Sequence, residues 1–570
     1  MKQIRYYMLA ALATMMLVGC TEDNNMDAIP KPVPAGIPET DEVAKALSDI
    51  PGVTNVRLVD EENTADDDSE AGETEGLEAN RRAGETAYVP SYTFSFEQPI
   101  DHNRPELGTY LQACRLRYKG AEKNVVVLTH GYSMQYYDTD LATQLDANQL
   151  NIEHRYFGES LPEAFDNLDM TYLNSNQQAR DIHNIVSTLK KYLFKTGKWA
   201  STGTSKDGIT TALQAYWSDY YKWTDFDVYV PFCAPFLTGT DYTDGTHSCN
   251  DITPGTYLKD WCGYGYEDGS KEAIAYERLK KIPLLICTNA KIRAAANKAV
   301  YQAAPDSYQK ILEQYNAKSP MSTGDQTKDV TAFALYTYYN ALFGKFSYVQ
   351  FYTWADIVPD LKPLEDGTAT EDQWNFFMQF ITWDDKALNK YLADQQKKNS
   401  SQTMRRGLTK EEEQWDFLRF RRESPSAPYS IQSFTELGAA DNDYSIANAP
   451  GSILKPADCE KVNYMFTAQA LYEQCGKAGI YKQDGGKLMK GFRAWVKTEN
   501  TQPIIFVYAH NDPWTGGGID DVTVSQNPNM LVKVVDGTAT HTDAFLHREL
   551  YMKDSETKIV NALNKFLKLK

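Results

Sequence analysis

The stretch from Lys198 to Thr211 constrains the fold of this chain more than any other. It reads KWASTGTSKDGITT, a short run of apolar and small residues followed by a turn at Ser205 and a helical pattern. A serine between a strand and a helix, with a glycine two residues before it, is typical of a nucleophile elbow, in which the turn exposes the hydroxyl at the sheet edge. The alternative is that Gly203-Thr204-Ser205 only caps the helix. Asp207 interrupts the G-x-S-x-G consensus, because the final glycine, Gly208, comes one residue late.

The N-terminus carries a targeting signal. Lys2 and Arg5 precede an apolar run that ends in Leu17-Val18-Gly19-Cys20. This pattern predicts a signal peptide over residues 1–20 and acylation of Cys20, as in a bacterial lipoprotein. An ordinary signal peptide with an incidental cysteine is the alternative. The apolar run is too short to span a bilayer, so we expect a lipid-anchored protein of the cell envelope, held at the outer membrane and facing the periplasm or the cell surface.

Residues 21–90 are expected to form a flexible tether. Between Arg57 and Arg81 there are ten Asp or Glu residues and no Lys or Arg, about half of the formal net charge of −19. Such a segment cannot bury enough apolar surface to offset the entropy of ordering. The acidity argues against nucleic-acid binding, and it leaves the lipid anchor as the expected contact with a membrane.

The remaining chain alternates strand and helix patterns at both ends. Strands are expected at 124–129, 151–158, 228–230, 504–508 and 530–535, and helices at 177–194 and 554–569. Helical periodicity takes over in the middle, at 276–304, 330–343 and 372–398. We therefore expect an α/β fold, an α/β-hydrolase sheet built from residues 91–235 and 496–570, with a large, mainly helical cap at 236–495 inserted before the last strands.

An acid and a histidine follow the two late strands. Asp512 comes after the strand ending at Tyr508, and His541 after the strand ending at Val535. The chain order Ser205, Asp512, His541 is the order that this fold requires for a catalytic triad. Asp512 before a proline is also compatible with a simple turn. For the oxyanion hole, elbow geometry selects the backbone N–H of Lys206, and Tyr132 is the expected second donor.

Four motifs in order resemble one peptidase family. They are QPIDH at 98–102, EHRYFG at 153–158, GTSKDG at 203–208 and the turn at Asp512-Pro513-Trp514. Together they are similar to the bacterial secreted prolyl tri/tetrapeptidyl aminopeptidases, serine peptidases related to lysosomal prolyl carboxypeptidase and dipeptidyl peptidase II. The resemblance implies cleavage of short peptides from free N-termini, often after proline. It places glycine where this chain has Asp207, whose side chain is expected to crowd the elbow, so that Asp207→Gly would leave activity intact or raise it.

The implied activity needs a carboxylate for the substrate ammonium. Glu153, at the end of a strand, is our candidate, and a structural ion pair with Arg155 or another cation is the alternative. The sequence contains no CxxC, HExxH or EF-hand pattern, so we expect no metal and no cofactor, and peptides as the partners. Seven cysteines remain besides Cys20. Cys249 with Cys262 and Cys459 with Cys475 are close enough in sequence to pair, and Cys233 is expected to be a buried thiol.

Three functions fit these observations. A serine exopeptidase is the first. An esterase or other acyl hydrolase on the same fold is the second, because a triad does not by itself choose between amide and ester. A catalytically weakened binding lipoprotein is the third, because Asp207 stands at the last glycine position of the elbow consensus.

Overall fold

A computed structural model of the chain describes residues 41–59, 89–162, 170–238, 269–346, 358–382, 426–438, 444–466, 484, 486–510, 512–539, 541–548 and 550–569. The signal peptide and Cys20 lie outside these residues, as do Cys249, Cys262 and Cys475. Of the four cysteines that the structure gives as free thiols, Cys233 is buried as expected, and Cys459 is buried as well. Within the described part of the chain, no helix is both long and apolar enough to cross a membrane.

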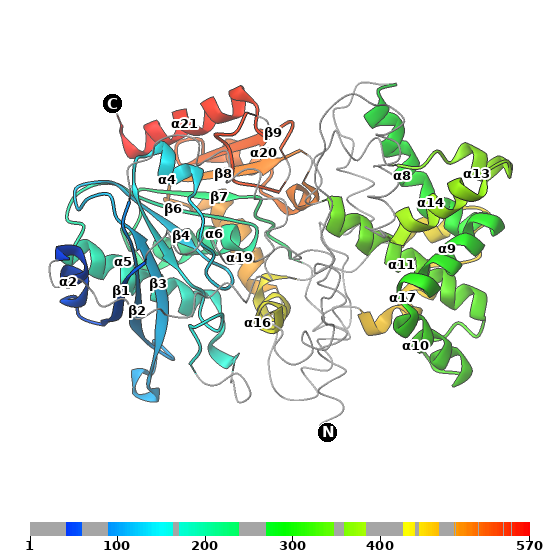
Figure 1. Ribbon diagram of the computed structural model, residues 1–570, viewed down its shortest axis with the longest axis horizontal. Coiled ribbons are helices and arrows are strands. Elements are labelled where there is room, and N and C mark those ends of the chain that lie inside the picture. The colour runs from blue at the N-terminus through cyan, green and yellow to red at the C-terminus, as the bar shows by residue number, and fades with distance from the viewer. Residues whose placement is uncertain are drawn as a thin grey trace.

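One nine-stranded sheet organises the body, in the order β1-β2-β3-β5-β4-β6-β7-β8-β9 (Figure 1). Strands β1 to β3 and β5 pair antiparallel, and the run from β5 through β4 and β6 to β9 is parallel. The strands are β1 (Val53–Val59), β2 (Ser91–Pro99), β3 (Thr109–Arg117), β4 (Val125–Thr129), β5 (Asn148–Ile152), β6 (Trp199–Thr204), β7 (Val228–Phe232), β8 (Ile504–Ala509) and β9 (Leu531–Asp536). This is the expected α/β-hydrolase sheet, and every strand that follows the elbow is parallel to its neighbours.

Alternating side chains of the central strands feed two separate cores. In β4, Val125 and Val127 enter the core that contains α5 (Ser175–Tyr192) and α6 (Lys206–Tyr221), whereas Val126 enters the core of the opposite face with α4 (Asp140–Gln144) and α21 (Lys553–Leu567). A strand buried on both faces needs apolar residues at every position, which is why β4 reads VVVLT. Both faces of the parallel strands are therefore covered by helices.

The cap has its own hydrophobic core. Its buried residues lie between Ala275 and Val462. They come mainly from α8 (Lys271–Thr288), α9 (Ala290–Ala303), α10 (Pro305–Asn316), α11 (Gln326–Phe346), α13 (Lys362–Asp366), α14 (Glu371–Thr382) and α17 (Pro456–Val462). Figure 1 shows these helices gathered on the opposite side of the view from β1 and α2 (Glu42–Ser48). The expected helical insertion is present, although residues 383–398 of its third predicted helix lie outside the described part of the chain.

The expected end of the cap at residue 495 is wrong. Helix α19 (Lys487–Thr498) buries Met489, Phe492 and Trp495 in the core of the body, and the indole Nε1 of Trp495 donates to Asp219 of α6 at 2.7 Å. The amphipathic pattern of α19 resembles that of a cap helix. Sequence alone does not tell which of two cores its apolar face covers.

The expected tether is also wrong in part. Residues 41–59 form α2 and β1, with Ala44, Leu47 and Val53 buried, and β1 pairs with β2 at the sheet edge. The acidic run that follows lowers the average hydropathy of the whole segment and hides this short apolar pattern. Residues 60–88 lie outside the described residues.

Candidate active site

Ser205 stands on a strained turn between β6 and α6. Its φ is 59° and its ψ is −122°, a conformation that costs a non-glycine residue on the order of 1–3 kcal/mol and is concentrated at functional sites. The turn is fixed on both sides. The N–H of Ser205 donates to Phe232 O at 3.0 Å, and the N–H of Ile209 donates to Ser205 O at 2.9 Å. Ser205 makes no capping hydrogen bond with its side chain, so the capping alternative loses its support.

Two glycines allow strand and helix to approach at this turn. A Cβ at Gly203 would lie 2.5 Å from the backbone carbon of Asp207, and a Cβ at Gly208 would lie 2.6 Å from Phe232 O. No side chain fits at either position. The elbow therefore has the glycines it needs, with the second at Gly208 rather than at position 207.

Asp207 does not crowd the elbow, contrary to expectation. Its Oδ1 accepts the backbone N–H of Gly131, and its Oδ2 lies 3.2 Å from Nδ1 of His130. The Nζ of Lys206 donates to the carbonyl of the same Gly131. A Cβ at Gly131 would lie 2.7 Å from Lys206 Cγ, so the loop after β4 rests directly on the elbow. Residues 206 and 207 thus hold both peptide groups of Gly131.

The contacts of Lys206 and Asp207 with Gly131 affect the candidate oxyanion hole. Lys206 is the first residue of α6, where backbone N–H groups point away from the helix and favour negative charge. Tyr132 follows Gly131, and the hydrogen bonds to Gly131 set the orientation of the peptide group that carries the Tyr132 N–H. The ammonium of Lys206 is buried and lies 5.0, 4.8 and 5.8 Å from the ring centroids of Tyr132, Phe157 and Tyr429, respectively.

Asp512 and His541 form a hydrogen-bonded pair. Oδ2 of Asp512 lies 2.9 Å from Nδ1 of His541, and both side chains are almost completely buried. Oδ1 of Asp512 accepts the N–H of Trp514 at 3.0 Å and so starts the short helix η10 (Pro513–Gly517). The turn and the acid are alternative interpretations of Asp512, and its carboxylate both forms the turn with Trp514 and contacts His541.

The loop that carries His541 is held by the end of β9. Oδ1 of Asp536 accepts the N–H groups of Thr538 and Ala539, each at 2.8 Å, and its Oδ2 accepts the N–H of Met552 at 2.8 Å. Since β6, β8 and β9 are parallel, Ser205, Asp512 and His541 all leave the sheet at its carboxyl edge. The structure thus joins the acid to the histidine directly and places the serine at the same edge.

The assignment of Glu153 to the substrate ammonium needs correction. Its Oε1 accepts the N–H of Met134 at 2.9 Å, and its Oε2 accepts the N–H of Glu159, the N–H of Ser160 and the hydroxyl of Ser160 at 2.9, 3.0 and 2.7 Å. Burial raises the pKa of this carboxyl to about 7, against the lowering effect of these hydrogen bonds. Both oxygens are therefore committed to the chain, and Glu153 joins two loops beside the elbow.

Arg155 and His102 belong to a buried network around Asp181. Arg155 donates to Asp181 through Nε and Nη2 at 2.7 and 2.9 Å, Nε2 of His102 lies 2.6 Å from Oδ1, and the hydroxyl of Tyr110 donates to Oδ2 at 2.8 Å. The alternative interpretation had paired Arg155 with Glu153. Sequence reasoning missed Asp181, whose signal was a charged residue on the apolar stripe of the predicted helix at 177–194. The network joins the motifs at 98–102 and 153–158, and its role is structural.

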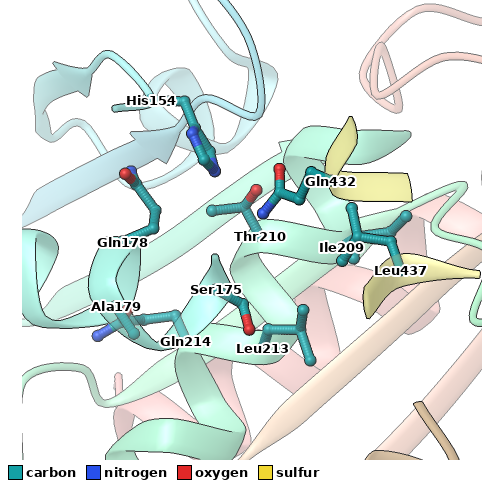
Figure 2. Close-up of a pocket in the computed structure, with 10 residues that line it drawn as sticks. All are labelled: His154, Ser175, Gln178, Ala179, Ile209, Thr210, Leu213, Gln214, Gln432 and Leu437. Carbon is teal, nitrogen blue, oxygen red and sulfur yellow. The ribbon is translucent and has the colours of Figure 1, made fainter. Parts of the chain in front are cut away.

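A small cavity lies behind the elbow helix (Figure 2). It is lined by α5 and α6, by His154, and by Gln432 and Leu437, which end α16 (Ser426–Gln432) and η7 (Ser433–Leu437). Among the described residues, the buried Gln178 Nε2, Gln214 Oε1 and Gln432 Oε1 have no hydrogen-bond partner. A cavity of this size suits one ordered water molecule, which would satisfy these amides, and it is too small for a peptide.

Residues 77–253 match the family described as PS-10 peptidase S37. A prolyl tri/tetrapeptidyl aminopeptidase from Streptomyces mobaraensis is 31% identical over 143 residues, which cover 25% of this chain and 28% of that protein. The matched part thus spans less than a third of the relative.

Solved esterases are similar in outline only. The rice cell wall degrading esterase LipA from Xanthomonas oryzae covers 90% of this chain and 98% of its own, at 13% identity and a TM-score of 0.31. The acetyl xylan esterase from Paenibacillus sp. R4 covers 34% of this chain and 58% of its own, at 15% identity and a TM-score of 0.21. At TM-scores this low, neither esterase is evidence for the fold or the activity of this chain. The fold assignment rests on the strand order of the sheet and on the chain order of Ser205, Asp512 and His541. The match over residues 77–253, which include the elbow, and the named relative together make this part of the chain similar to the peptidase S37 family of serine-type peptidases.

Proposed function

We propose that the chain is a serine exopeptidase that removes tri- or tetrapeptides from free N-termini, with a preference for cleavage after proline. The observation that carries the catalytic part is the pairing of Asp512 with His541 at the sheet edge where Ser205 occupies a strained elbow. The name of the Streptomyces relative supports the peptide specificity.

The geometry supports an acyl-enzyme mechanism. With Nδ1–H of His541 donating to Asp512, the imidazole presents Nε2 as the base that takes the proton of Ser205. The Ser205 oxygen attacks the scissile carbonyl, and the N–H groups of Lys206 and Tyr132 stabilise the oxyanion. His541 returns the proton to the leaving amine, and water then releases the peptide from Ser205 by the same steps. Asp512 keeps the imidazole tautomer and stabilises the imidazolium.

Fluorophosphonate labelling tests the nucleophile. The unmodified protein should be labelled at Ser205, and Ser205→Ala should lose both labelling and turnover by several orders of magnitude. Thr204→Ala is a matched control, because it changes the neighbouring hydroxyl and leaves the elbow glycines in place. Labelling that persists in Ser205→Ala refutes the assignment, and a protein that is never labelled favours the weakened binding lipoprotein.

Substrate panels test the specificity. Chromogenic tri- and tetrapeptides ending in proline should be cleaved when the amino terminus is free and resist cleavage when it is acetylated. Acetylation removes the substrate ammonium and leaves the enzyme carboxylate that binds it buried and unpaired. The loss of transition-state stabilisation is on the order of 2–5 kcal/mol, or roughly 30- to several-thousand-fold in rate. Equal cleavage of both forms contradicts the exopeptidase. Rapid hydrolysis of acyl esters with no peptide cleavage selects the esterase.

The cellular location of the protein is part of the same proposal. Acylated Cys20 would anchor the enzyme at the outer membrane, with peptides as its substrates. Mass spectrometry of the mature terminus should find a diacyl- or triacyl-cysteine at position 20. An unmodified terminus elsewhere would refute the anchor without touching the catalytic proposal.

A further inference from the structure

A third potential ligand, Cys233, lies beside the catalytic acid and histidine. Cys233 follows β7, is completely buried, and has a φ of 49°. Its N–H donates to Val507 O at 2.8 Å, and its Sγ lies 3.9 Å from Thr542 O. A non-glycine residue at positive φ is costly and is found mainly where the surroundings fix it. The turn after β7 therefore holds this thiol within the site.

Three different ligand atoms converge there. Sγ of Cys233, a carboxylate oxygen of Asp512 and an imidazole nitrogen of His541 all lie within 4.8 Å of one another. Zinc binds sulfur at about 2.3 Å, histidine nitrogen at about 2.0–2.1 Å and carboxylate oxygen at about 2.0–2.2 Å, so two ligands of one tetrahedral ion lie about 3.4–3.6 Å apart. Atoms of this cluster that lie up to 4.8 Å apart would have to approach by about 1 Å to enclose an ion, with a fourth position left for water.

The charges of this cluster also suit a divalent cation. A thiolate and a carboxylate neutralise a 2+ ion, and a neutral assembly is the one that tolerates burial best. Binding releases the thiol proton of Cys233 to solvent as the sulfur–metal bond forms.

We propose that Cys233, Asp512 and His541 form an inhibitory binding site for a soft divalent cation, with Zn²⁺ as the type ion. The bound ion would occupy the imidazole and the carboxylate that the proposed reaction needs, so His541 could no longer accept the proton of Ser205. Hard ions such as Mg²⁺ prefer oxygen ligands and should have no effect. The proposal rests on the proposed serine chemistry for its inhibitory consequence, whereas binding of the ion does not depend on it.

Zinc titration of the labelling reaction is the first test. Zn²⁺ should block fluorophosphonate labelling of the unmodified protein, a chelator should restore it, and Mg²⁺ should not block it. Cys233→Ala should require at least about 10-fold more Zn²⁺ for half-inhibition. Cys233→Gly is a second variant, because glycine accepts the positive φ without strain. Equal zinc sensitivity of the unmodified protein and both variants overturns the proposal.

Cobalt absorption is the second test, and it does not require activity. Co²⁺ added to Ser205→Ala protein should produce a near-ultraviolet thiolate-to-cobalt band, which the double variant with Cys233→Ala should lack. Cys114→Ala is the matched control, since Cys114 is an equally buried free thiol on β3. A band that survives loss of Cys233, or no band at all, refutes the site. If the unmodified protein binds cobalt but is not labelled by the fluorophosphonate, the proposed serine chemistry is refuted and the metal site is not.

Discussion

Asp207 accepts the backbone N–H of Gly131, so the residue two places after the candidate nucleophile fixes the loop that carries the second oxyanion donor. Lys206 holds the carbonyl of the same glycine. Preorganised donors are often the largest single contribution to catalysis, because they are already oriented when charge develops. We therefore propose a positioning role for Asp207, which stands where the family pattern has glycine.

Replacing Asp207 with glycine should therefore lower turnover, in contrast to the expectation from sequence. Loss of one oxyanion donor typically costs about 10²- to 10³-fold, and a displaced donor should cost about 10-fold or more in kcat with little change in KM. Asp207→Asn is the control, because its amide oxygen can still accept the Gly131 N–H. Steady-state kinetics on one chromogenic peptide measure all three proteins. Unchanged turnover in Asp207→Gly would restore the view that a side chain here only crowds the elbow.

Asp512→Asn should separate the two roles of this side chain. The amide oxygen can keep the cap on Trp514, while the amide nitrogen, facing Nδ1, favours the wrong imidazole tautomer. In chymotrypsin-type serine proteases the equivalent change lowers kcat by about 10⁴-fold, and we expect a loss of similar order with the fold intact. Circular dichroism and peptide turnover measure the two effects. Turnover within 10-fold of the unmodified enzyme would remove Asp512 from the mechanism.

Glu153 should make stability depend on pH. Its folded pKa of about 7 exceeds the ordinary value of 4.5, so the folded state holds the proton more tightly. The resulting stabilisation is fully present below about pH 4.5 and is lost as pH rises to about 7, by on the order of 3 kcal/mol. Glu153→Gln should flatten this slope in denaturant titrations between pH 4.5 and 7. An unchanged slope would show that Glu153 is ionised throughout this range in the folded protein.

Glu153→Gln also tests whether Glu153 binds the substrate ammonium or only the chain itself. At pH 8, Glu153→Gln turns an amide NH₂ toward backbone donors and should lower stability by roughly 1–3 kcal/mol. The ratio of rates on free and acetylated peptides should stay the same. A selective loss on free peptides would return Glu153 to the substrate site.

Removing Asp181 should be among the most damaging changes in the body. Asp181→Asn leaves the buried guanidinium of Arg155 without its counter-charge, at a cost of about 3–5 kcal/mol in unfolding free energy. Asp146→Asn is the matched control, because Asp146 pairs with Lys119 and Lys123 at the exposed surface and should change stability by less than about 1 kcal/mol. Thermal and urea unfolding compare them. Equal, small effects would mean that the network around Asp181 relaxes without its ion pair.

The strands that carry the candidate site could be predicted from sequence because their signal is local. β4 and β8 are continuous apolar runs, and the residues after β8 and β9 carry the acid and the histidine in the order that the fold requires. Cys233 could be predicted as a buried thiol for the same reason, since it follows a core strand. Its closeness to Asp512 could not be predicted, because it depends on the positive φ of Cys233 and on the pairing of β7 with β8.

The missed features depend on contacts between distant segments. Glu153 has the charge of an ammonium anchor, but its role is decided by Met134, Glu159 and Ser160, which fold back over it. The sequence shows Asp207 only as a departure from the elbow consensus, because its hydrogen-bond partner, Gly131, is 76 residues away in the chain. The hairpin strands β2 and β3 also escaped notice, because half-exposed alternation is a weaker signal than a continuous apolar run.

The pairing of β1 with β2 changes the reach of the enzyme from its proposed anchor. Residues 41–59 are fastened to the sheet, so the acidic run at 60–88 begins and ends on neighbouring strands and adds no length between Cys20 and the body. Only residues 21–40 remain for that span, at most about 70 Å when fully extended. Lengthening the acidic run should leave the distance to the bilayer unchanged, whereas each residue inserted before position 41 should extend it.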